Sequence, residues 1–140
     1  MQLRLFLRDK RARFLWRFRA AGHKQVSKWR YFRDVEVDGL DTELVAKLDM
    51  ARHMCEFPFL ITSGKRTPDQ NERVGGVQSS SHLTGRAVDL MCHGSVARYK
   101  MLRALFTVGF QRIGIYQKHI HVDLDHSKPQ VVAWLEEYKD

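Results

Sequence analysis

A histidine and an aspartate stand seven positions apart in the segment SSSHLTGRAVDLM, residues 79–91. Both His82 and Asp89 belong to the side-chain types that bind zinc in proteins. Side chains alternate between the two faces of a strand, so in an extended run Asp89 points away from its apolar neighbours Val88 and Leu90. The segment therefore predicts two metal ligands beside a turn, at the entrance to a buried strand.

A second segment, KHIHVDLDH at residues 118–126, carries three more side chains of this kind. In an extended strand His119, His121 and Asp123 share one face, and the apolar residues between them share the other. The apolar face suits the core. Three polar groups in a row on the opposite face suit the floor of a cleft.

Placing the two strands side by side allows His82, Asp89 and one or both histidines of the second segment to converge. Two imidazoles and one carboxylate leave a tetrahedral zinc ion one open position for water, the pattern of catalytic rather than structural sites. Zinc bound in this way lowers the pKa of the water to about 7 and polarises a scissile carbonyl. A lone loop histidine is usually an ordinary surface residue, and most HxH strands bind no metal. The prediction of a zinc hydrolase site therefore depends on the two segments occurring together.

Two helices and a short closing helix are predicted from apolar residues at helical spacing. The first covers residues 38–54, where Asp41 or Thr42 can cap the helix. Its apolar stripe consists of Leu44, Val45, Leu48 and Ala51. The second covers residues 95–110, and its inward side is expected to carry Val96, Tyr99 or Met101, Leu102, Leu105 and Phe106. The closing helix covers residues 129–140 and begins at a proline, which suits a first helical turn.

Short apolar, β-prone runs predict three or four strands. They fall at residues 57–61, at 86–92 and, as one or two strands, within 112–125. Residues 67–85 are rich in turn-forming types and are predicted to be a long loop, which is more typical of a functional segment than of a plain connection. Strands separated by helices, but too few and too closely turned for a doubly wound sheet, predict an α+β fold.

The net charge of +8 is concentrated at one end of the chain. Residues 1–33 hold eight arginines and three lysines against one aspartate, a net +10, which leaves −2 for the rest. Aromatic residues are interleaved with these arginines, and their amphipathic spacing predicts a basic helical arm at residues 1–30. Such an arm suits a polyanion, such as an anionic envelope polymer, a lipid surface or nucleic acid. The alternative is a solvated helix whose aromatic residues dock on the domain.

Several classes of protein are excluded by the sequence. It has no stretch of ~18 uncharged apolar residues that could span a membrane. Arginines interrupt the apolar N-terminal segment, so that it is not interpreted as a signal peptide. Cys55 and Cys92 lack CxxC spacing and are expected to be thiols rather than a disulfide. At 140 residues, the chain is expected to fold as one domain with an appendage, and to be a monomer.

Three successive motifs, ITSGKRTPDQN, SSSHLTGRAVDL and IGIYQKHIHVDLD, carry a resemblance to a known family. They resemble the motifs of the zinc D-alanyl-D-alanine carboxypeptidases and L-alanyl-D-glutamate endopeptidases, the peptidoglycan-cutting metallopeptidases of bacteria and of phage lysis enzymes. The resemblance covers residues 31–125, so the predicted parts are an arm at 1–30 and a peptidase domain at 31–140. It implies a small α+β fold with an antiparallel sheet, flanking helices and a zinc site on the sheet face.

The resemblance also implies roles for single residues. It assigns zinc binding to His82, Asp89 and His121. Arg66 matches the family arginine that faces the substrate, where a guanidinium can hold a peptide carboxylate or stabilise an oxyanion. The alternative for Arg66 is a salt bridge within its loop. Ser81 matches the serine beside the first ligand, which binds substrate or orients the loop.

One position departs from the family pattern. Many members carry a glutamate or aspartate three residues before the last ligand as the general base, and this chain has Lys118 there. His119 instead stands two residues before His121, so we assign it as the acid/base or the transition-state stabiliser. Asp123 is the rival base, or else a carboxylate that orients a ligand histidine.

The sequence therefore predicts a zinc metallopeptidase that hydrolyses an amide bond in peptidoglycan stem peptides or cross-links, as a D,D-carboxypeptidase or an endopeptidase. Without a signal peptide, it is expected to be made in the cytoplasm and to act at the cell wall or periplasm, as a phage lysis enzyme released by a holin would. Nucleic acid is not the expected partner. The alternative is a non-catalytic, metal-stabilised binding protein whose arm binds nucleic acid or an anionic envelope, but such a protein has no need of Arg66.

Overall fold

The first long helix forms where the sequence supplies both a cap and an apolar stripe. The structure is a computed structural model and describes residues 27–136. Helix α3 (Thr42–Cys55) is capped by Asp41, whose carboxylate accepts hydrogen bonds from the backbone N–H groups of Glu43 and Leu44. The predicted stripe is buried along its whole length: Leu44, Val45, Leu48 and Ala51.

Helix α5 (Ser95–Thr107) forms where a helix was predicted, but its inward face differs in part. Its buried residues are Met101, Ala104 and Leu105. The prediction of inward side chains was wrong for Val96 and Phe106, which are exposed, and of the alternatives Tyr99 and Met101 it is Met101 that faces inward. The stripe that packs in the core with α3 follows the spacing from Met101 to Leu105, so apolar residues outside that stripe face outward.

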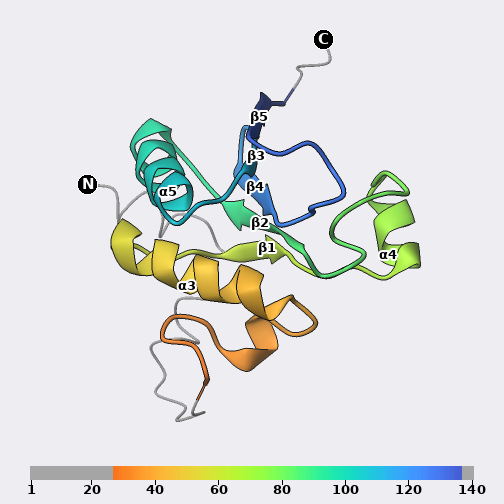
Figure 1. Cartoon of the computed structure of the whole chain (residues 1–140), viewed down its shortest axis with the longest axis horizontal. Coiled ribbons are helices and arrows are strands. Elements are labelled where there is room, and N and C mark those ends of the chain that lie inside the picture. The colour runs from red at the N-terminus through yellow and green to blue at the C-terminus, as the bar shows by residue number, and fades with distance from the viewer. Residues whose placement is uncertain (1–26, 137–140) are drawn as a thin grey trace.

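Within residues 27–136, five strands form one sheet in the order β1-β2-β4-β3-β5. Its strands are β1 (Ile61–Ser63), β2 (Ala87–Met91), β3 (Arg112–Ile115), β4 (His119–Asp123) and β5 (Val132–Leu135). The first four pair antiparallel with their neighbours, whereas β5 pairs parallel with β3 (Figure 1). The predicted α+β fold with a mainly antiparallel sheet is confirmed. The predicted strand at residues 57–61 was placed too early, because only its last residue belongs to β1.

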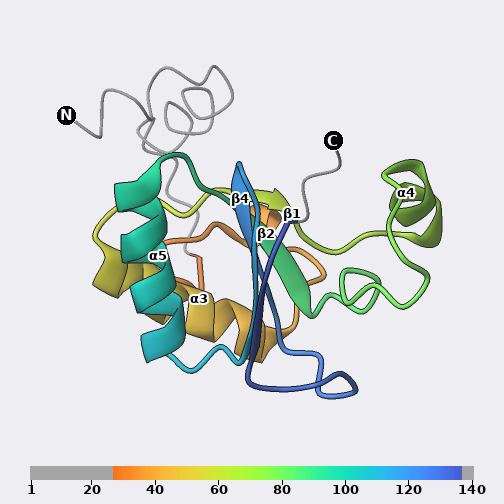
Figure 2. The same cartoon turned by 90° about the horizontal axis from the view of Figure 1, so that it is seen from above.

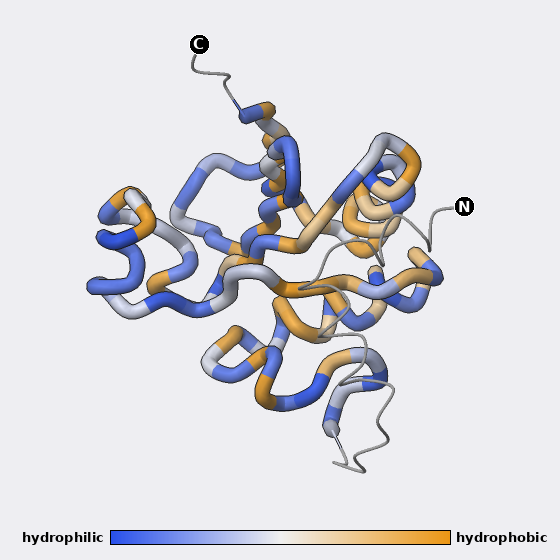
Figure 3. The backbone as a smooth tube through the Cα atoms, turned by 180° about the vertical axis from the view of Figure 1, so that it is seen from behind, coloured by the Kyte–Doolittle hydropathy of each residue, from blue (hydrophilic) through white to orange (hydrophobic). Residues whose placement is uncertain are grey.

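The alternation of side chains along β2 and β4 separates the core from the opposite face of the sheet. Val88 lies opposite Val122 and Leu90 opposite Ile120, and all four are buried in the core with residues of α3 and α5. Figure 2 shows α3 and α5 on one side of the sheet, and Figure 3 shows hydrophobic stretches in the sheet and in α5. The opposite face carries the polar residues of both segments: Asp89, His119, His121 and Asp123.

The predicted loop at residues 67–85 contains a short helix, α4 (Pro68–Arg73). Thr67 caps it, because its hydroxyl accepts from the Gln70 N–H while the Gln70 side chain accepts from the Thr67 N–H. A proline at the first helical position suits this start. The loop prediction was therefore wrong for these six residues, although the capping signal is visible in the sequence. Figure 2 shows α4 on the side of the sheet away from α3 and α5.

The predicted closing helix at residues 129–140 was wrong where the structure describes it, since Val132–Leu135 form β5. Every second residue of this segment is more exposed, which is the period of a strand rather than of a helix. Pairing with β3 gives this segment backbone hydrogen bonds within a sheet. A short isolated helix, by contrast, is only marginally stable in water. The indole of Trp134 then packs over Gly114, where a Cβ would come within 2.7 Å of the ring.

The basic arm falls almost wholly outside the described residues, which begin at residue 27. Trp29, near the end of the arm, packs against the core. Tyr31, which follows the arm, does the same. Cys55 and Cys92 are buried free thiols, as predicted, and burial raises the pKa of Cys55 to about 11. No helix within residues 27–136 is long and apolar enough to cross a membrane.

A close backbone contact near the end of the loop depends on Gly85. Its φ is +72°, and a Cβ there would lie 2.2 Å from the carbonyl oxygen of Gly39. Replacing Gly85 with alanine is expected to lower the free energy of unfolding by the left-handed cost of about 1–2 kcal/mol and by roughly 1–3 kcal/mol more for the overlap. Gly75→Ala is the matched control, since Gly75 has φ +69° but open space around it. Urea unfolding of both variants measures the difference, and equal losses would contradict the role of the contact.

Candidate metal centre

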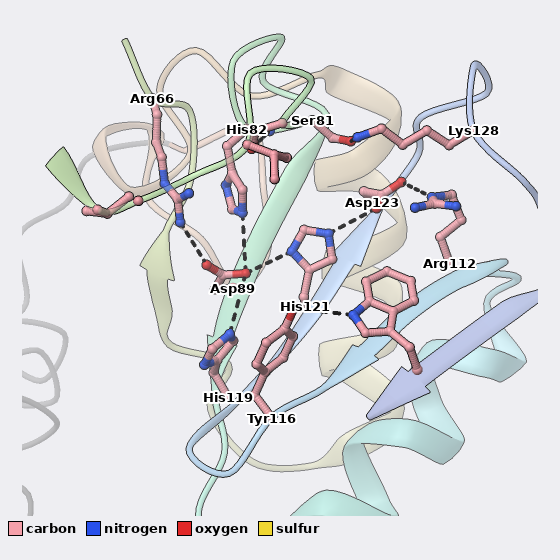
Figure 4. Close-up of a pocket in the computed structure, with 15 residues that line it drawn as sticks. Arg66, Ser81, His82, Asp89, Arg112, Tyr116, His119, His121, Asp123 and Lys128 are labelled. Atoms are coloured by element: carbon pink, nitrogen blue, oxygen red, sulfur yellow. Dashed lines mark hydrogen bonds and ion pairs between the residues drawn. The ribbon is translucent and has the colours of Figure 1, made fainter. Parts of the chain in front are cut away.

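Three side chains from three parts of the chain meet on the polar face of the sheet. Asp89 in β2 lies opposite His121 in β4, and His82 reaches them from the turn before β2. One ligand atom from each residue lies within 4.8 Å of the other two. Figure 4 shows both rings directed toward the Asp89 carboxylate. The structure thus brings together the three residues that the resemblance assigned as zinc ligands.

The Asp89 carboxylate lies between the two histidine rings. Its Oδ1 is 2.9 Å from His121 Nδ1 and 3.3 Å from His82 Nε2. Burial alone would raise the pKa of Asp89, but hydrogen bonds from the two histidines outweigh burial and hold the pKa well below its usual range. For His121, burial would lower the pKa, and hydrogen bonds to Asp123 and Asp89 raise it instead. The centre therefore keeps an ionised carboxylate, which is the form that binds a metal.

The remaining ring nitrogens of both histidines face oxygen acceptors. His82 Nδ1 lies 2.7 Å from the carbonyl oxygen of Gly64, which can only accept, so Nδ1 donates a hydrogen bond there. His121 Nε2 lies 3.0 Å from Asp123 Oδ2. A metal that displaces the protons between these rings and Asp89 would therefore meet the lone pairs of His82 Nε2 and His121 Nδ1. Histidines that ligate metals are typically held in this way. Two imidazole nitrogens and a carboxylate, oriented by these contacts, fit a zinc-type cation.

Arg66 lies against the outer oxygen of the same carboxylate. Its Nη2 donates to Asp89 Oδ2 at 3.1 Å, and its Nε donates to Ser63 Oγ at 2.9 Å. The side chain lines the pocket above the three residues. Arg66 thus forms a salt bridge with a candidate metal ligand in β2 rather than within its own loop, and the guanidinium still borders the pocket.

His119 lies beside the three residues rather than among them. Its Nε2 is 3.9 Å from Asp89 Oδ1, and its ring stacks on Tyr116 with the ring centroids 4.3 Å apart. The side chain is 32% exposed and lines the pocket, and burial of the rest lowers its pKa. His119 therefore borders the pocket while remaining close to the centre.

Asp123 is buried, and partners within the protein meet both of its oxygens. Oδ1 accepts from Arg112 Nε at 2.7 Å and from the Asp125 N–H at 3.0 Å, while Oδ2 faces His121. Burial would raise its pKa, but the hydrogen bond with His121 and other contacts lower it. This geometry favours the orienting carboxylate over the general base, the two roles that the sequence left open.

The hydroxyl of Ser81 is engaged in contacts between two loops. Ser81 Oγ donates to Asp125 Oδ2 at 2.7 Å and accepts from Lys128 Nζ at 2.8 Å. Lys128 also donates to the carbonyl oxygen of Ser79 at 2.6 Å. Since the one hydroxyl proton of Ser81 is used within the protein, the arrangement favours loop orientation over substrate binding.

A pocket of about 450 Å³ opens over the centre. Sequence reasoning assigned seven of its polar residues to one site but missed others that line it: Arg112, Tyr116, Lys128 and Trp134. In RIGI the two isoleucines share the apolar face, so alternation places Arg112 with Gly114 on the opposite, polar face. This pattern could have identified the arginine as a site residue. Trp134 was missed because its segment was predicted to be a helix.

Comparisons with known proteins identify a family and similar solved structures. The model of the family described as Peptidase M15 matches residues 22–125. Among solved structures, the chain is similar to the L-Ala D-Glu endopeptidase ChiX of Serratia marcescens, with 20% sequence identity and a TM-score of 0.53, over 67% of this chain and 86% of that chain. At this identity the similarity shows the fold alone. No curated protein matches the chain.

Proposed function

Because the chain belongs to the peptidase M15 family, we propose that it is a zinc-dependent peptidase that hydrolyses an amide bond of peptidoglycan peptides at the cell wall. The observation that carries the proposal is the approach of His82, Asp89 and His121 within 4.8 Å of one another, in a pocket that Arg66 also lines. A binding protein stabilised by metal needs the three ligands but has no use for an arginine beside them. The similar fold of an L-Ala D-Glu endopeptidase supports a peptide from peptidoglycan as the substrate.

Three protein atoms would hold the metal: His82 Nε2, His121 Nδ1 and a carboxylate oxygen of Asp89. Bound zinc would act as a Lewis acid toward the scissile carbonyl and supply a nucleophile at neutral pH. The Gly64 carbonyl and the Asp123 carboxylate hold the two rings, so that His82 Nε2 and His121 Nδ1 face the shared position and would lose their protons to bind the metal.

Arg66 and His119 act on the substrate from the protein side. A guanidinium has five N–H donors, and the contacts of Arg66 with Ser63 and Asp89 leave donors for a peptide carboxylate or a developing oxyanion. His119, partly exposed in the pocket, transfers the proton between the nucleophile and the leaving amine.

The pocket suits a short peptide that carries carboxylate groups. Its volume of about 450 Å³ is within the usual range for small-molecule sites. Arg66 and Lys128 both line it and supply positive charge. Stem peptides offer carboxylates beside their amide bonds, so the same pocket accommodates either an L-Ala to D-Glu bond or a terminal D-alanine.

Mass analysis of products from purified peptidoglycan tests the proposal. The zinc-loaded protein is incubated with peptidoglycan, and released fragments are compared with those from an Asp89→Asn variant purified in the same way. Free D-alanine identifies a carboxypeptidase, whereas a new amino-terminal D-glutamate identifies an endopeptidase. A zinc-loaded protein that creates no new amino or carboxyl terminus in directly cross-linked or bridged peptidoglycan would contradict the proposed function.

The basic arm is proposed to hold the enzyme on an anionic envelope. Deleting residues 1–21, which precede the family match, removes six arginines and one lysine against one aspartate. It retains Trp29 and Tyr31, which pack against the core. Cleavage of soluble peptides is expected to stay unchanged and activity on whole envelopes to fall. Because salt screens such contacts over about 10 Å at 0.1 M, the advantage of the full chain should shrink across a salt series.

A full-length variant with the six arginines of residues 1–21 replaced by glutamine is the matched control. It keeps the length and aromatic residues of the arm while removing most of its charge, so it should behave like the deletion on envelopes. If the arm instead packs on the domain, the deletion lowers the melting temperature and the soluble-peptide activity together.

A further inference from the structure

Arg112 is a buried charge that the proposed chemistry does not use. It begins β3, on the same face of the sheet as the metal centre, and is only 9% exposed. Burying a guanidinium is costly unless its donors and its charge are matched. The partners of Arg112 therefore indicate what the residue does.

Those partners join Arg112 to a candidate metal ligand through one carboxylate. Arg112 Nε donates to Asp123 Oδ1 at 2.7 Å, and Asp123 Oδ2 lies 3.0 Å from His121 Nε2. Arg112 thus engages one oxygen and leaves the other directed at the histidine. Figure 4 shows Arg112, Asp123 and His121 in this order.

The guanidinium is itself held from two further directions. Its Nη1 donates to the carbonyl oxygen of Pro129, and its central carbon lies 5.4 Å from the centroid of a Trp134 ring. Both partners come from the segment that leads into and forms β5. A lysine could not satisfy these three contacts together, because an ammonium lacks the planar fork of a guanidinium.

We infer that Arg112 is a positioning residue that acts through Asp123 to hold the His121 ring with Nδ1 toward the metal position. Without Arg112, the only hydrogen bond to Asp123 Oδ1 that remains among the described residues is from the backbone N–H of Asp125. The carboxylate could then turn, and the His121 ring would lose its fixed orientation. This inference rests on the proposed function only in taking His121 as a metal ligand.

A double-mutant cycle on zinc affinity tests the inference. Metal-stripped wild type, Arg112→Gln, Asp123→Asn and the double variant are titrated with zinc in competition with a chromophoric chelator. Loss of a group that orients a metal ligand typically weakens affinity about 10- to 100-fold, and this range is expected for each single variant. If Arg112 acts through Asp123, the double variant should bind zinc no more weakly than the weaker single variant.

Two further variants separate positioning from general stability. Arg112→Lys keeps the charge without the fork and is expected to weaken zinc binding several-fold. Arg86→Gln is the matched control, because Arg86 forms ion pairs with Asp41 and Glu43 and does not line the pocket. It is expected to bind zinc like the wild type, even where the melting temperature of the metal-free protein falls.

The outcomes distinguish this inference from the proposed function. Unchanged zinc affinity in Arg112→Lys or in folded Arg112→Gln overturns the positioning role, as do strictly additive losses in the double variant. If Arg112→Gln does not fold, Arg112→Lys alone decides by the same measurement. A wild type that binds no zinc contradicts the proposed metal centre instead.

Discussion

Replacing His82, Asp89 or His121 with alanine is expected to remove zinc from the protein and reduce peptide hydrolysis to the uncatalysed rate. The wild type should hold close to one zinc per chain. Each of the three residues supplies one ligand atom to a group that spans only 4.8 Å, so the loss of one leaves two protein ligands. Catalytic zinc sites generally use three. Elemental analysis of proteins purified without chelators measures the metal, and rates on soluble peptides measure the activity.

Thermal unfolding with and without added zinc provides a second readout of the same prediction. A ligand that binds the native state alone stabilises it, so zinc should raise the melting temperature of the wild type but not of the three variants. His126→Ala is the matched control, because His126 is an exposed histidine just beyond β4 that does not line the pocket. Full zinc occupancy in all three variants would show that the metal binds elsewhere.

Asp89→Asn refines the test, since alanine at this position also leaves Arg66 without its carboxylate partner. The amide retains the shape of the side chain but removes the charge that two histidines and an arginine surround. We expect Asp89→Asn to fold with an intact pocket and still to lose zinc. A variant that folds and keeps zinc would mean that the carboxylate serves the arginine rather than the metal.

The candidate metal centre could be predicted from sequence because its geometry depends on two short segments. The two-residue period of β4 alone places His119, His121 and Asp123 on one face. Turn residues likewise place His82 in the turn that leads into a strand, and the apolar run after the turn places Asp89 within that strand. Only the pairing of β2 with β4 had to be assumed, and the structure has it in the register that sets Asp89 opposite His121.

The outer part of the pocket could not be predicted, because it depends on contacts between distant segments. Trp134 reaches the site only through parallel pairing of β5 with β3, and a four-residue strand has too little pattern to exclude a helix. Arg112 becomes important through its contact with Asp123, eleven residues away in a neighbouring strand. The exposed residues of α5 were misplaced for a similar reason, since the helix itself does not reveal which edge of its apolar surface meets α3.

Replacing His119 with alanine is expected to preserve zinc binding and lower the rate of hydrolysis by a hundredfold or more. The ring lies outside the group of three, with its Nε2 3.9 Å from Asp89 Oδ1, and it lines the pocket that substrate would enter. The His119 ring stacks on Tyr116, and this contact leaves both imidazole nitrogens available. Tyr116 is itself held by a hydrogen bond that its hydroxyl accepts from Trp134 Nε1. Removing a general acid or base typically costs 10²–10⁴-fold in rate. Rates at saturating zinc, with the metal content measured in the same samples, test the expectation.

Asp123→Asn separates the two residues that the sequence proposed for proton transfer. Asp123 is buried between Arg112 and His121, so its replacement should weaken zinc binding and leave much of the rate once zinc is saturating. His119→Ala should show the reverse pattern, and added imidazole should restore part of its activity, because the cavity left by the ring opens to solvent. Full activity in His119→Ala together with loss of the rate in zinc-loaded Asp123→Asn would reverse the two roles. Loss of zinc from His119→Ala would instead make His119 a fourth protein ligand, and that would remove the open position on which hydrolysis depends.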